Sequence, residues 1–373
     1  MNSCSPLTIF TGTKAMFIKL VPLALEFDRR KWHYRIIDTG QHADLVSHVI
    51  EQFGLREPEI SLDPGQKGVS TLTGGFAWML RLLSYMFNSR SALKAKLFEG
   101  KEGICFIHGD TVSTLLSCLI AKRAGQKVAH VEAGLRSHNY LHPFPEEIVR
   151  VMVMRMADIL FAPSPSAMEN LQKMGLDHKS HLLPGNTNID TMRITLSRPQ
   201  GEIPNVPKEY SLATIHRLET LYSQKKMRLM VDTLIEANST VPLAFIMHPP
   251  TIKRLKKYNL QSRLTAAGII TLPLMDHSTF LHLLKNARFV ITDGGSIQEE
   301  MSYLGVPCLL LRKTTEREEG IGRNVVLSGM DISKVRNFLH RFGDYRHVSL
   351  PNALLSPSAC IADVISDLSA LDG

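Results

Sequence analysis

The chain has 373 residues, a formal charge of +8, and 44% hydrophobic and 21% charged residues. This length predicts two domains of roughly 150–200 residues each, and the composition is typical of a soluble globular protein. No segment approaches the roughly 18–20 uncharged apolar residues of a membrane span. The start of the chain also lacks the basic and apolar pattern of a secretory signal, so we expect a cytoplasmic protein without membrane contact.

The basic charge favours anionic partners, but the basic residues are dispersed and form no stripe or aromatic platform. We therefore expect no nucleic-acid partner and favour a phosphorylated small molecule. The cysteines are widely spaced without a paired metal-ligand pattern, which predicts reduced thiols and no metal site. They are Cys4, Cys105, Cys118, Cys308 and Cys360.

Strands and helices alternate from the start of the chain. Residues 7–11 (LTIFT) predict a buried strand, residues 14–27 a helix, and residues 34–40 a second strand that ends in a turn at Gly40. This alternation predicts right-handed βαβ units and a parallel sheet.

Residues 76–87 predict a helix with an apolar stripe directed at the core. Its residues recur at helical spacing: Phe76, Leu80, Leu83 and Phe87. A subunit interface is the alternative, because Trp78, Tyr85 and Met86 add apolar surface outside the stripe.

Two carboxylates follow consecutive predicted strands. Residues 103–108 predict a strand that ends before Asp110, and a helix then runs until Gly125. The next strand, residues 127–130, ends just before Glu132. Ligands of parallel sheets bind outside the carboxyl ends of the strands, so we expect both carboxylates on the same rim.

The stretch from His130 to Arg150 concentrates acidic and basic residues around Gly134, Pro143 and Pro145. It contains Glu132, Arg136, Glu146, Glu147 and Arg150. Carboxylates and guanidinium groups beside a strand end suit a polar reaction cleft, whereas a solvated loop with ordinary salt bridges is the alternative.

A proline-rich connector, residues 197–209, fits a nearby domain boundary, and the alternation of strands and helices then restarts. The first strand of this half, residues 210–217, ends in His216 and Arg217. His216 faces a cleft if two such domains oppose each other; a structural histidine is the alternative.

Asp293-Gly294-Gly295-Ser296 separates a predicted strand (289–292) from a predicted helix (297–304). Glycines allow a ligand to approach the backbone, and free N–H groups at a helix start attract phosphate. A turn needed only for packing is the alternative. Glu300 lies one helical turn further on and suits a ribose diol, or is a surface glutamate.

Basic residues follow this candidate phosphate cradle in the segment LRKTTEREEGIGRN. They are Arg312, Lys313, Arg317 and Arg323. They suit a diphosphate, and a solvated charged loop is the alternative.

Several segments together resemble the non-hydrolysing UDP-N-acetylglucosamine 2-epimerases in order and spacing, over about residues 8–330. These segments are HGDT, HVEAGLRS, PFPEEIVR, GNTNIDT, IHR, DGGSIQEE and GVPCLLLRKTTER. The resemblance implies an α/β fold class with two Rossmann-like domains facing a central cleft (GT-B-like), and a homodimer. We expect an N-terminal domain of residues 1–185, joined by 355–373, and a UDP-binding domain of residues 186–354.

The resemblance also implies a mechanism that needs no cofactor. UDP is eliminated from C1 with loss of the C2 proton, and it returns to the resulting 2-acetamidoglucal after protonation on the other face. The implied catalytic residues are Asp110, Glu132, Glu146, Arg150 and His216, and which carboxylate is the base stays open. The implied substrate-binding residues are Lys14, Lys19, Arg136, Phe280, Gly294, Gly295, Ser296, Glu300 and Arg317.

The chain departs from the family pattern at several positions. The family usually begins GTRPEAIK, whereas this chain has GTKAMFIK, so Lys14 replaces an arginine and the Pro-Glu pair is absent. A lysine lacks the bidentate fork of arginine, so diphosphate binding is expected to be altered. Val149 replaces an asparagine. Ala43 and Asp44 interrupt the segment to which many members bind a second, activating UDP-N-acetylglucosamine.

The sequence therefore predicts a divergent UDP-N-acetylglucosamine 2-epimerase whose product feeds a surface polysaccharide. Three rivals stay open: a hydrolysing relative that releases N-acetylmannosamine and UDP, a GT-B glycosyltransferase, and a non-catalytic nucleotide-sugar-binding protein.

Overall fold

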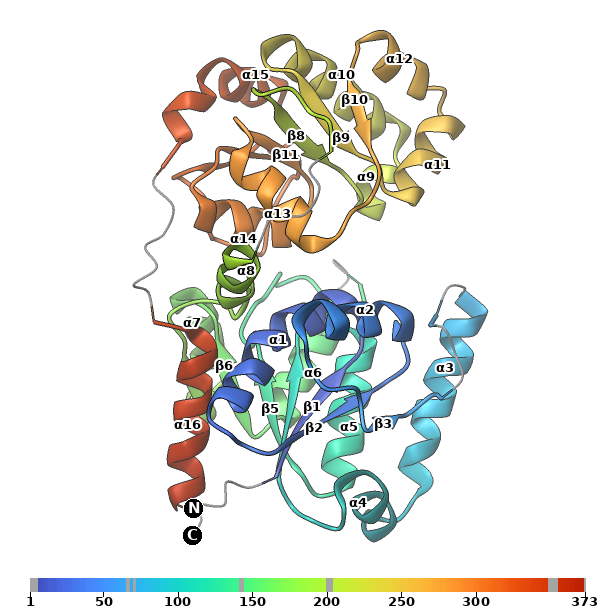
Figure 1. Ribbon diagram of the computed structural model, residues 1–373, viewed down its shortest axis with the longest axis vertical. Helices are drawn as coiled ribbons and strands as arrows, with labels where there is room; N and C mark the ends of the chain where they lie inside the picture. Colours follow the sequence, from blue (N-terminus) through green and yellow to red (C-terminus); the bar gives the residue numbers. More distant parts are fainter. Residues whose placement is uncertain are drawn as a thin grey trace. The chain divides into compact units, whose positions relative to one another are not determined.

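The computed structural model describes residues 6–64, 68–69, 72–140, 144–198, 204–347 and 355–371. The chain divides into two compact units, which we call unit 1 (Met1–Thr191 with Leu355–Gly373) and unit 2 (Met192–Leu354). Each unit holds one sheet with helices on both faces (Figure 1). The predicted α/β fold with two Rossmann-like domains is confirmed.

Unit 1 is built on a seven-stranded sheet in the order β3-β2-β1-β4-β5-β6-β7. Each pair of neighbouring strands is parallel. The order reverses between β1 and β4, and ligands of such sheets bind at this switch point. The strands are β1 (Leu7–Thr11), β2 (Tyr34–Asp38), β3 (Ile60–Ser61), β4 (Ile104–His108), β5 (Lys127–Val131), β6 (Ile159–Ala162) and β7 (Ser180–Leu182).

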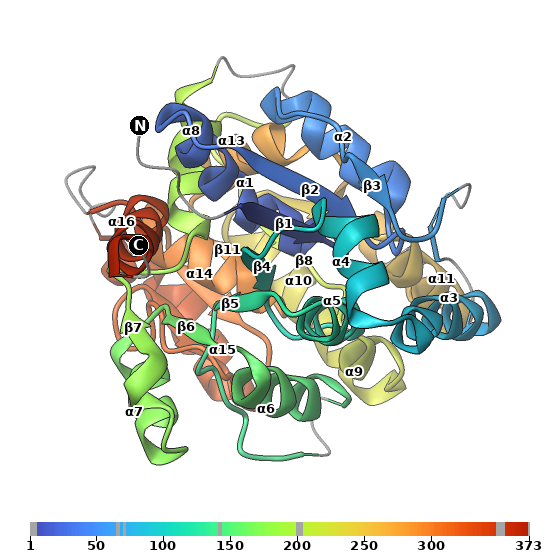
Figure 2. The same ribbon diagram turned by 90° about the horizontal axis from the view of Figure 1, so that it is seen from below.

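Helices cover both faces of this sheet. Helices α1, α2 and α16 lie on one face, and α3, α4, α5 and α6 on the other (Figure 2). The helices of unit 1 are α1 (Lys14–Arg29), α2 (Ala43–Phe53), α3 (Leu72–Ser84), α4 (Arg90–Phe98), α5 (Val112–Arg123), α6 (Glu146–Met156), α7 (Pro165–Lys173) and α16 (Pro357–Leu371), with the short helices η1 (Tyr85–Phe87) and η2 (Asp177–Lys179). Helix α8 (Asn188–Ser197) begins in unit 1 and ends in unit 2.

The C-terminal helix α16 packs against α1, the first helix of the chain. Arg30 Nη2, at the end of α1, lies 2.6 Å from Asp363 Oδ1 on α16. Asp190 Oδ2 accepts a hydrogen bond from Ser358 N over 2.9 Å and so fixes the start of α16. The end of the chain thus completes unit 1.

The predicted helix at residues 76–87 exists, but its expected orientation is wrong. Phe76 and Leu80 are 59% and 50% exposed, whereas Trp78 and Leu82 are 3% and 0% exposed. Both sides of α3 are apolar, so helical spacing could not select the buried one. The Trp78 indole determines which side is buried, because its Nε1 donates to Thr39 O over 2.8 Å. Of the predicted core stripe, Phe76, Leu80 and Phe87 are exposed, and Leu83 packs against the core.

Unit 2 repeats the plan with a six-stranded sheet in the order β10-β9-β8-β11-β12-β13. Its neighbouring strands are also parallel, and the order reverses between β8 and β11. The strands are β8 (Ser211–Thr214), β9 (Leu243–Ile246), β10 (Ile270–Leu272), β11 (Val290–Thr292), β12 (Cys308–Leu310) and β13 (Val325–Leu327).

Two hydrophobic clusters hold the helices of unit 2 to opposite faces of its sheet. One joins the sheet to α10, α12 and α15, and the other joins it to α13 and α14. The helices are α9 (Leu218–Leu221), α10 (Gln224–Thr240), α11 (Pro249–Lys257), α12 (Gln261–Ala266), α13 (His277–Asn286), α14 (Gly295–Leu304) and α15 (Ile332–Arg341), with the short helix η3 (Phe342–Tyr345).

Within the described ranges, no helix is both long enough and apolar enough to span a membrane. The cysteines in those ranges, Cys105, Cys118, Cys308 and Cys360, are free thiols, as predicted. Cys4 lies outside the described residues.

Candidate active site

Asp110 lies in the turn between β4 and α5, at the switch point of unit 1. Gly109 makes this turn with a left-handed φ of +71°. Helix α5 begins directly afterwards because the side chain of Thr111 caps it by accepting a hydrogen bond from Thr114 N. Arg150 Nη2, on α6, lies 2.6 Å from Asp110 Oδ2. The local sequence thus shapes the turn, whereas a distant arginine orients the carboxylate.

Glu132 directly follows β5, and its carboxylate is buried among donors. Its φ of +69° is left-handed, which is uncommon for a residue other than glycine. Lys19 Nζ lies 2.7 Å from Glu132 Oε1, and Asn186 Nδ2 donates to the same oxygen over 2.5 Å. His108 Nδ1 lies 3.7 Å from Glu132 Oε2. Lys19, predicted to bind substrate, is thus held by a carboxylate.

The structure brings Asp110 and Glu132 together, as the strand pattern predicts. Strands β4 and β5 are neighbours, with His108 opposite Val131, so both chains leave the sheet at the same edge. A Cβ added to Gly109 would lie 3.8 Å from Glu132 Oε2. The carboxylate of Glu132 therefore approaches the turn that carries Asp110.

His130, the fourth residue of β5, anchors this turn. Its Nε2 lies 2.8 Å from Gly109 O, so this nitrogen carries the proton and donates it. Burial lowers the pKa of His130 to about 4, although the hydrogen bond to Gly109 and the nearby carboxylates act in the opposite direction. His130 is therefore neutral at neutral pH and positions the backbone beside Asp110.

The first turn of α6 carries two glutamates in different surroundings. Glu147 is completely buried, and Arg136 Nε and Ser137 N both donate to its carboxylate. Burial acts to raise the pKa of Glu147, but these donors and the charge of Arg150 hold it below its usual value. Glu146 Oε2 is buried without a hydrogen-bond partner among the described residues. Glu147 is therefore committed to ion pairs.

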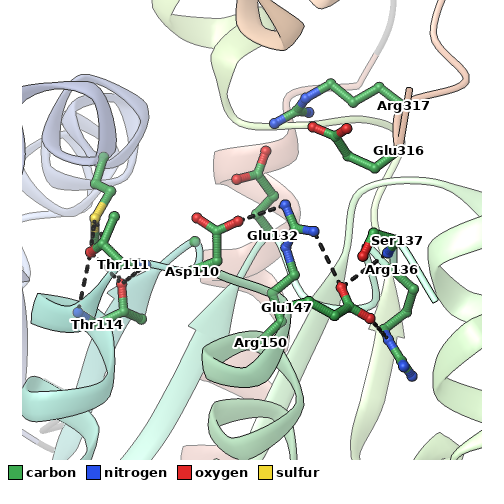
Figure 3. Close-up of polar contacts among 12 residues, drawn as sticks. Asp110, Thr111, Thr114, Glu132, Arg136, Ser137, Glu147, Arg150, Glu316 and Arg317 are labelled. Atoms are coloured by element: carbon green, nitrogen blue, oxygen red, sulfur yellow. Dashed lines mark hydrogen bonds and ion pairs between the residues drawn. The ribbon is translucent and has the colours of Figure 1, made fainter. Parts of the chain in front are cut away.

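Arg150 links Glu147 to the rim. Its guanidinium reaches Asp110 over 2.6 Å and Glu147 over 3.4 Å, and Figure 3 shows it between the two carboxylates. The side chain of Arg136, predicted to bind substrate, is only 11% exposed and pairs with Glu147. The acidic and basic residues of this stretch thus form a buried network, so the alternative of a solvated loop is wrong.

The departures from the family pattern at the start of α1 lie close to the same switch point. Lys14 is the first residue of α1 and is partly exposed. Met16 is buried, and its sulfur accepts a hydrogen bond from Thr111 Oγ1 over 2.9 Å. Thr114 Oγ1 lies 3.6 Å from the same sulfur. A thioether therefore packs against the hydroxyl groups at the start of α5.

In unit 2, Asp293 bridges the switch point between β8 and β11. It is completely buried, and its two oxygens accept hydrogen bonds from His216 N and Arg217 N over 3.0 and 3.1 Å. The ring of His216 stacks on that of His248, with centroids 4.7 Å apart. Burial, and secondly the nearby His216, lower the pKa of His248 to about 4. His216 is thus held by its backbone and by a neutral imidazole.

The candidate phosphate cradle opens α14 beside two of the other predicted residues. Gly294, the residue before the helix, has no side chain to cap it, and its own N–H donates to Thr292 Oγ1 over 3.0 Å. A Cβ added to Gly294 would lie 3.1 Å from His216 Cε1, and one added to Gly295 would lie 3.3 Å from Arg317 Nε. Ser296 is exposed. The glycines therefore leave room for a histidine and an arginine at a helix start suited to an anion.

The basic segment that follows β12 is tied to α14 by specific contacts. Arg317 Nη1 lies 2.9 Å from Glu299 Oε2, and both side chains are buried. Gln298 Nε2 donates to Arg317 O over 2.9 Å. Arg312 and Glu316 form a second pair at 2.8 Å. Burial acts to raise the pKa of Glu316, but Arg312 lowers it to about 2. Arg317 is therefore placed beside the cradle by a buried glutamate.

Glu300 and Phe280 lie on the neighbouring helices α14 and α13. Glu300 is only 5% exposed, and its Oε1 is 3.4 Å from His277 Nε2. Its other carboxylate oxygen is buried without a hydrogen-bond partner among the described residues. Phe280 is half-buried against the hydrophobic cluster of that face. The alternative in which Glu300 is a surface glutamate is wrong.

The predicted site residues fall into two sets, one on each unit. Unit 1 carries Lys14, Lys19, Asp110, Glu132, Arg136, Glu146 and Arg150, and unit 2 carries His216, Phe280, Gly294, Gly295, Ser296, Glu300 and Arg317. Sequence reasoning assigned no supporting role to Asn186, His130, His277 or Glu299, because no local pattern marks a side chain whose partner is distant. In the part of the chain that the structure describes, no cluster of three or more His, Cys, Asp or Glu residues could hold a metal.

The two sheets and their rims define a GT-B-like α/β protein with two Rossmann-like units. A family model described as UDP-N-acetylglucosamine 2-epimerase matches residues 25–352. The chain belongs to the UDP-N-acetylglucosamine 2-epimerase family.

Individual relatives agree with this membership. A UDP-N-acetylglucosamine 2-epimerase of Methanocaldococcus jannaschii is 31% identical, over 91% of this chain and 95% of the relative. One of Bacillus subtilis is also 31% identical, over 89% of this chain and 85% of the relative. The crystal structure of the M. jannaschii UDP-GlcNAc 2-epimerase in complex with UDP-GlcNAc and UDP has a TM-score of 0.80 at 29% identity, and covers 97% of this chain and 99% of that chain.

Proposed function

We propose that this chain inverts C2 of a UDP-N-acetylhexosamine, converting UDP-N-acetylglucosamine to UDP-N-acetylmannosamine without net hydrolysis. One observation carries the proposal. This chain, which belongs to the family, has Asp110 and Glu132 side by side, just past the carboxyl ends of adjacent strands. Two carboxylates at a switch point suit a reaction that moves a proton and develops positive charge.

Inversion at C2 requires both a group that transfers a proton and a group that stabilises positive charge. The C2 hydrogen is not adjacent to a carbonyl group, so it is barely acidic until positive charge develops at C1. As the C1–O bond breaks and UDP leaves, a carboxylate takes the C2 proton, and the C–H electron pair forms the double bond of 2-acetamidoglucal. Protonation of C2 from the opposite face and return of UDP to C1 then give the epimer. Nearby carboxylates stabilise the charge at C1 and transfer the protons.

In this proposal Asp110, Glu132 and Glu146 supply these carboxylates. Arg150 orients Asp110 through their 2.6 Å contact. Glu146 is included because its buried Oε2 has no hydrogen-bond partner among the described residues, whereas Glu147 is fully engaged in ion pairs.

Unit 2 is proposed to bind the UDP part of the substrate. The start of α14, with Gly294, Gly295, Ser296 and Arg317, takes the diphosphate, and His216 assists its departure. Glu300 binds the ribose and Phe280 stacks on the uracil. On unit 1, Lys14 is proposed to supply positive charge for the sugar diphosphate, whereas Lys19 and Arg136 are paired with Glu132 and Glu147 and act through these carboxylates.

We further propose that the chain works as a cytoplasmic homodimer without a cofactor, in the supply of a surface-polysaccharide precursor. The exposed apolar face of α3 and η1 supports the dimer, because Phe76, Leu80 and Phe87 are 59%, 50% and 91% exposed. Apolar patches of this kind mark interaction surfaces. Sedimentation at micromolar concentration tests this assembly.

The reaction is tested by incubating the protein with UDP-N-acetylglucosamine in D2O and following it by proton NMR. We expect UDP-N-acetylmannosamine with deuterium at C2, because the proton that is removed exchanges with solvent before it returns. A boiled sample is the control for spontaneous exchange.

Each rival predicts a different spectrum. Accumulation of free N-acetylmannosamine and UDP would replace the proposal by a hydrolysing epimerase. Binding of UDP-N-acetylglucosamine without turnover or exchange would leave a nucleotide-sugar-binding protein, and transfer of the sugar to an added acceptor would leave a glycosyltransferase.

A further inference from the structure

Two donors from distant parts of unit 1 converge on one oxygen of Glu132. Lys19 Nζ, on α1, lies 2.7 Å from Oε1. Asn186 Nδ2, from the segment between β7 and α8, lies 2.5 Å from the same oxygen. Lys19 and Asn186 are 6% and 2% exposed, so water does not weaken these contacts appreciably.

The amide of Asn186 is itself held in one orientation. Its Oδ1 accepts a hydrogen bond from Asn188 N over 3.3 Å. Thr187 Oγ1 donates to the same oxygen over 3.4 Å. A flipped amide would oppose its NH2 group to the backbone N–H of Asn188, where neither group can accept. The NH2 group of Asn186 is therefore directed at Glu132.

Fixing Oε1 determines where the other carboxylate oxygen lies. Glu132 Oε2 is 3.7 Å from His108 Nδ1, and a Cβ added to Gly109 would lie 3.8 Å from it. Oε2 is therefore on the side of the turn that carries Asp110. The left-handed φ of Glu132, +69°, shows that the backbone is also held in an uncommon conformation here.

We propose that Asn186 is a positioning residue of the active site: together with Lys19 it holds Oε1 of Glu132, turns Oε2 toward the reaction rim and stabilises the charged carboxylate. Lys19 then acts on Glu132 rather than directly on the substrate. The inference rests on the proposed function, because it assumes that Glu132 is one of the reacting carboxylates.

The test variant is Asn186→Asp, which replaces the donor by a like charge at nearly the same shape. A like charge raises the pKa of a carboxyl group, so the limb of the pH–rate profile set by Glu132 should move about 1–3 pH units higher. At neutral pH we expect kcat to fall about 10- to 100-fold, which is less than the about 10²–10⁴-fold that an acid–base group contributes, because Glu132 itself is kept. The affinity for UDP should stay within about twofold because the proposed UDP site is on unit 2. Asn186→Ala, which removes the donor without adding charge, should move the limb less and in the same direction.

Asn238→Asp is the matched control. Asn238 Nδ2 donates to Ala267 O, and its Oδ1 accepts from Leu243 N, both over 2.8 Å, so the same change disrupts a similar amide whose partners here are backbone groups of unit 2. It should leave the pH profile unmoved even if it lowers the melting temperature.

Carbon NMR of the Glu132 carboxyl group in the resting protein gives a readout that needs no turnover. Its titration should move to higher pH in Asn186→Asp and in Asn186→Ala, and not in Asn238→Asp. An unmoved titration, or activity that follows only the folded fraction, would overturn the role of Asn186. A moved titration in a protein that turns over no UDP-sugar would support the contact and reject the proposed function instead.

Discussion

Asp110→Asn is expected to abolish turnover of UDP-N-acetylglucosamine while leaving UDP binding largely intact. The substitution keeps the shape of the side chain at the switch point but removes its charge and its ability to take up a proton. Arg150 Nη2, 2.6 Å from Oδ2, would then face a neutral amide. Loss of one proton-transferring group lowers rates by about 10²–10⁴-fold. In the proposed function unit 2 binds UDP, so titration calorimetry with UDP should give an affinity close to that of the wild type.

The matched control for this prediction is Asp177→Asn. Asp177 is exposed in the short helix η2 of the same unit, so the same change there should alter neither rate nor binding. Normal turnover by Asp110→Asn would remove Asp110 from the mechanism. Loss of both turnover and UDP binding would show that its role is in folding or in substrate binding.

Glu147→Gln is expected to destabilise the protein by about 3–5 kcal/mol at neutral pH, the usual cost of breaking a buried ion pair from one side. The Glu147 side chain is 0% exposed, and the two guanidinium groups that it neutralises, those of Arg136 and Arg150, are 11% and 9% exposed. Without the carboxylate charge Arg136 stays buried and poorly compensated, and Arg150 keeps only its contact with Asp110 among these carboxylates. Urea unfolding of both proteins measures the difference.

The same pair of proteins gives a pH prediction. The pKa of Glu147 is lowered in the folded state, where the Ser137 N–H and the two arginines outweigh the effect of burial. A lowered pKa contributes stability that is fully present above the unfolded value, about 4.3 for glutamate. That stability is lost as the pH falls through the folded pKa. The stability difference between wild type and Glu147→Gln should therefore be constant at neutral pH and shrink below about pH 4.3.

Glu169→Gln is the control for the ion-pair argument. Glu169 pairs with Lys173 at 2.8 Å on α7, but the two side chains are 62% and 66% exposed. An exposed pair one helical turn apart contributes little to stability, because water and salt screen it. Equal effects of the two substitutions would contradict the assignment of Glu147 to a buried network.

Local patterns in the sequence were sufficient for the parallel α/β architecture and for the positions of Asp110 and Glu132. Each depends on short-range rules: an apolar run forms a buried strand, and a glycine such as Gly109 permits the turn that follows it. Because parallel strands end at one edge of the sheet, two such turns on adjacent strands must place their side chains near each other. The pairing of β4 with β5 in the structure bears this out.

Short-range sequence patterns could not predict which side of α3 is buried. Helical spacing selected Phe76 and Leu80, yet Trp78 and Leu82 are the buried residues. When both sides of a helix are apolar, the choice depends on which side chain finds a partner, and the partner of Trp78 is Thr39 O, 39 residues away.

The sequence by itself determined the family pattern, the alternation of strands and helices, and the chemical types of residue available at the strand ends, because these follow from near neighbours in the chain. Only the tertiary structure decided what each charged side chain does. Lys19 and Asn186 reach Glu132 across 113 and 54 residues of sequence, and Glu147 is buried between two arginines while Glu146 is not. Burial and pairing arise when distant segments pack together, and they determine whether a carboxylate supports the fold or faces the reaction.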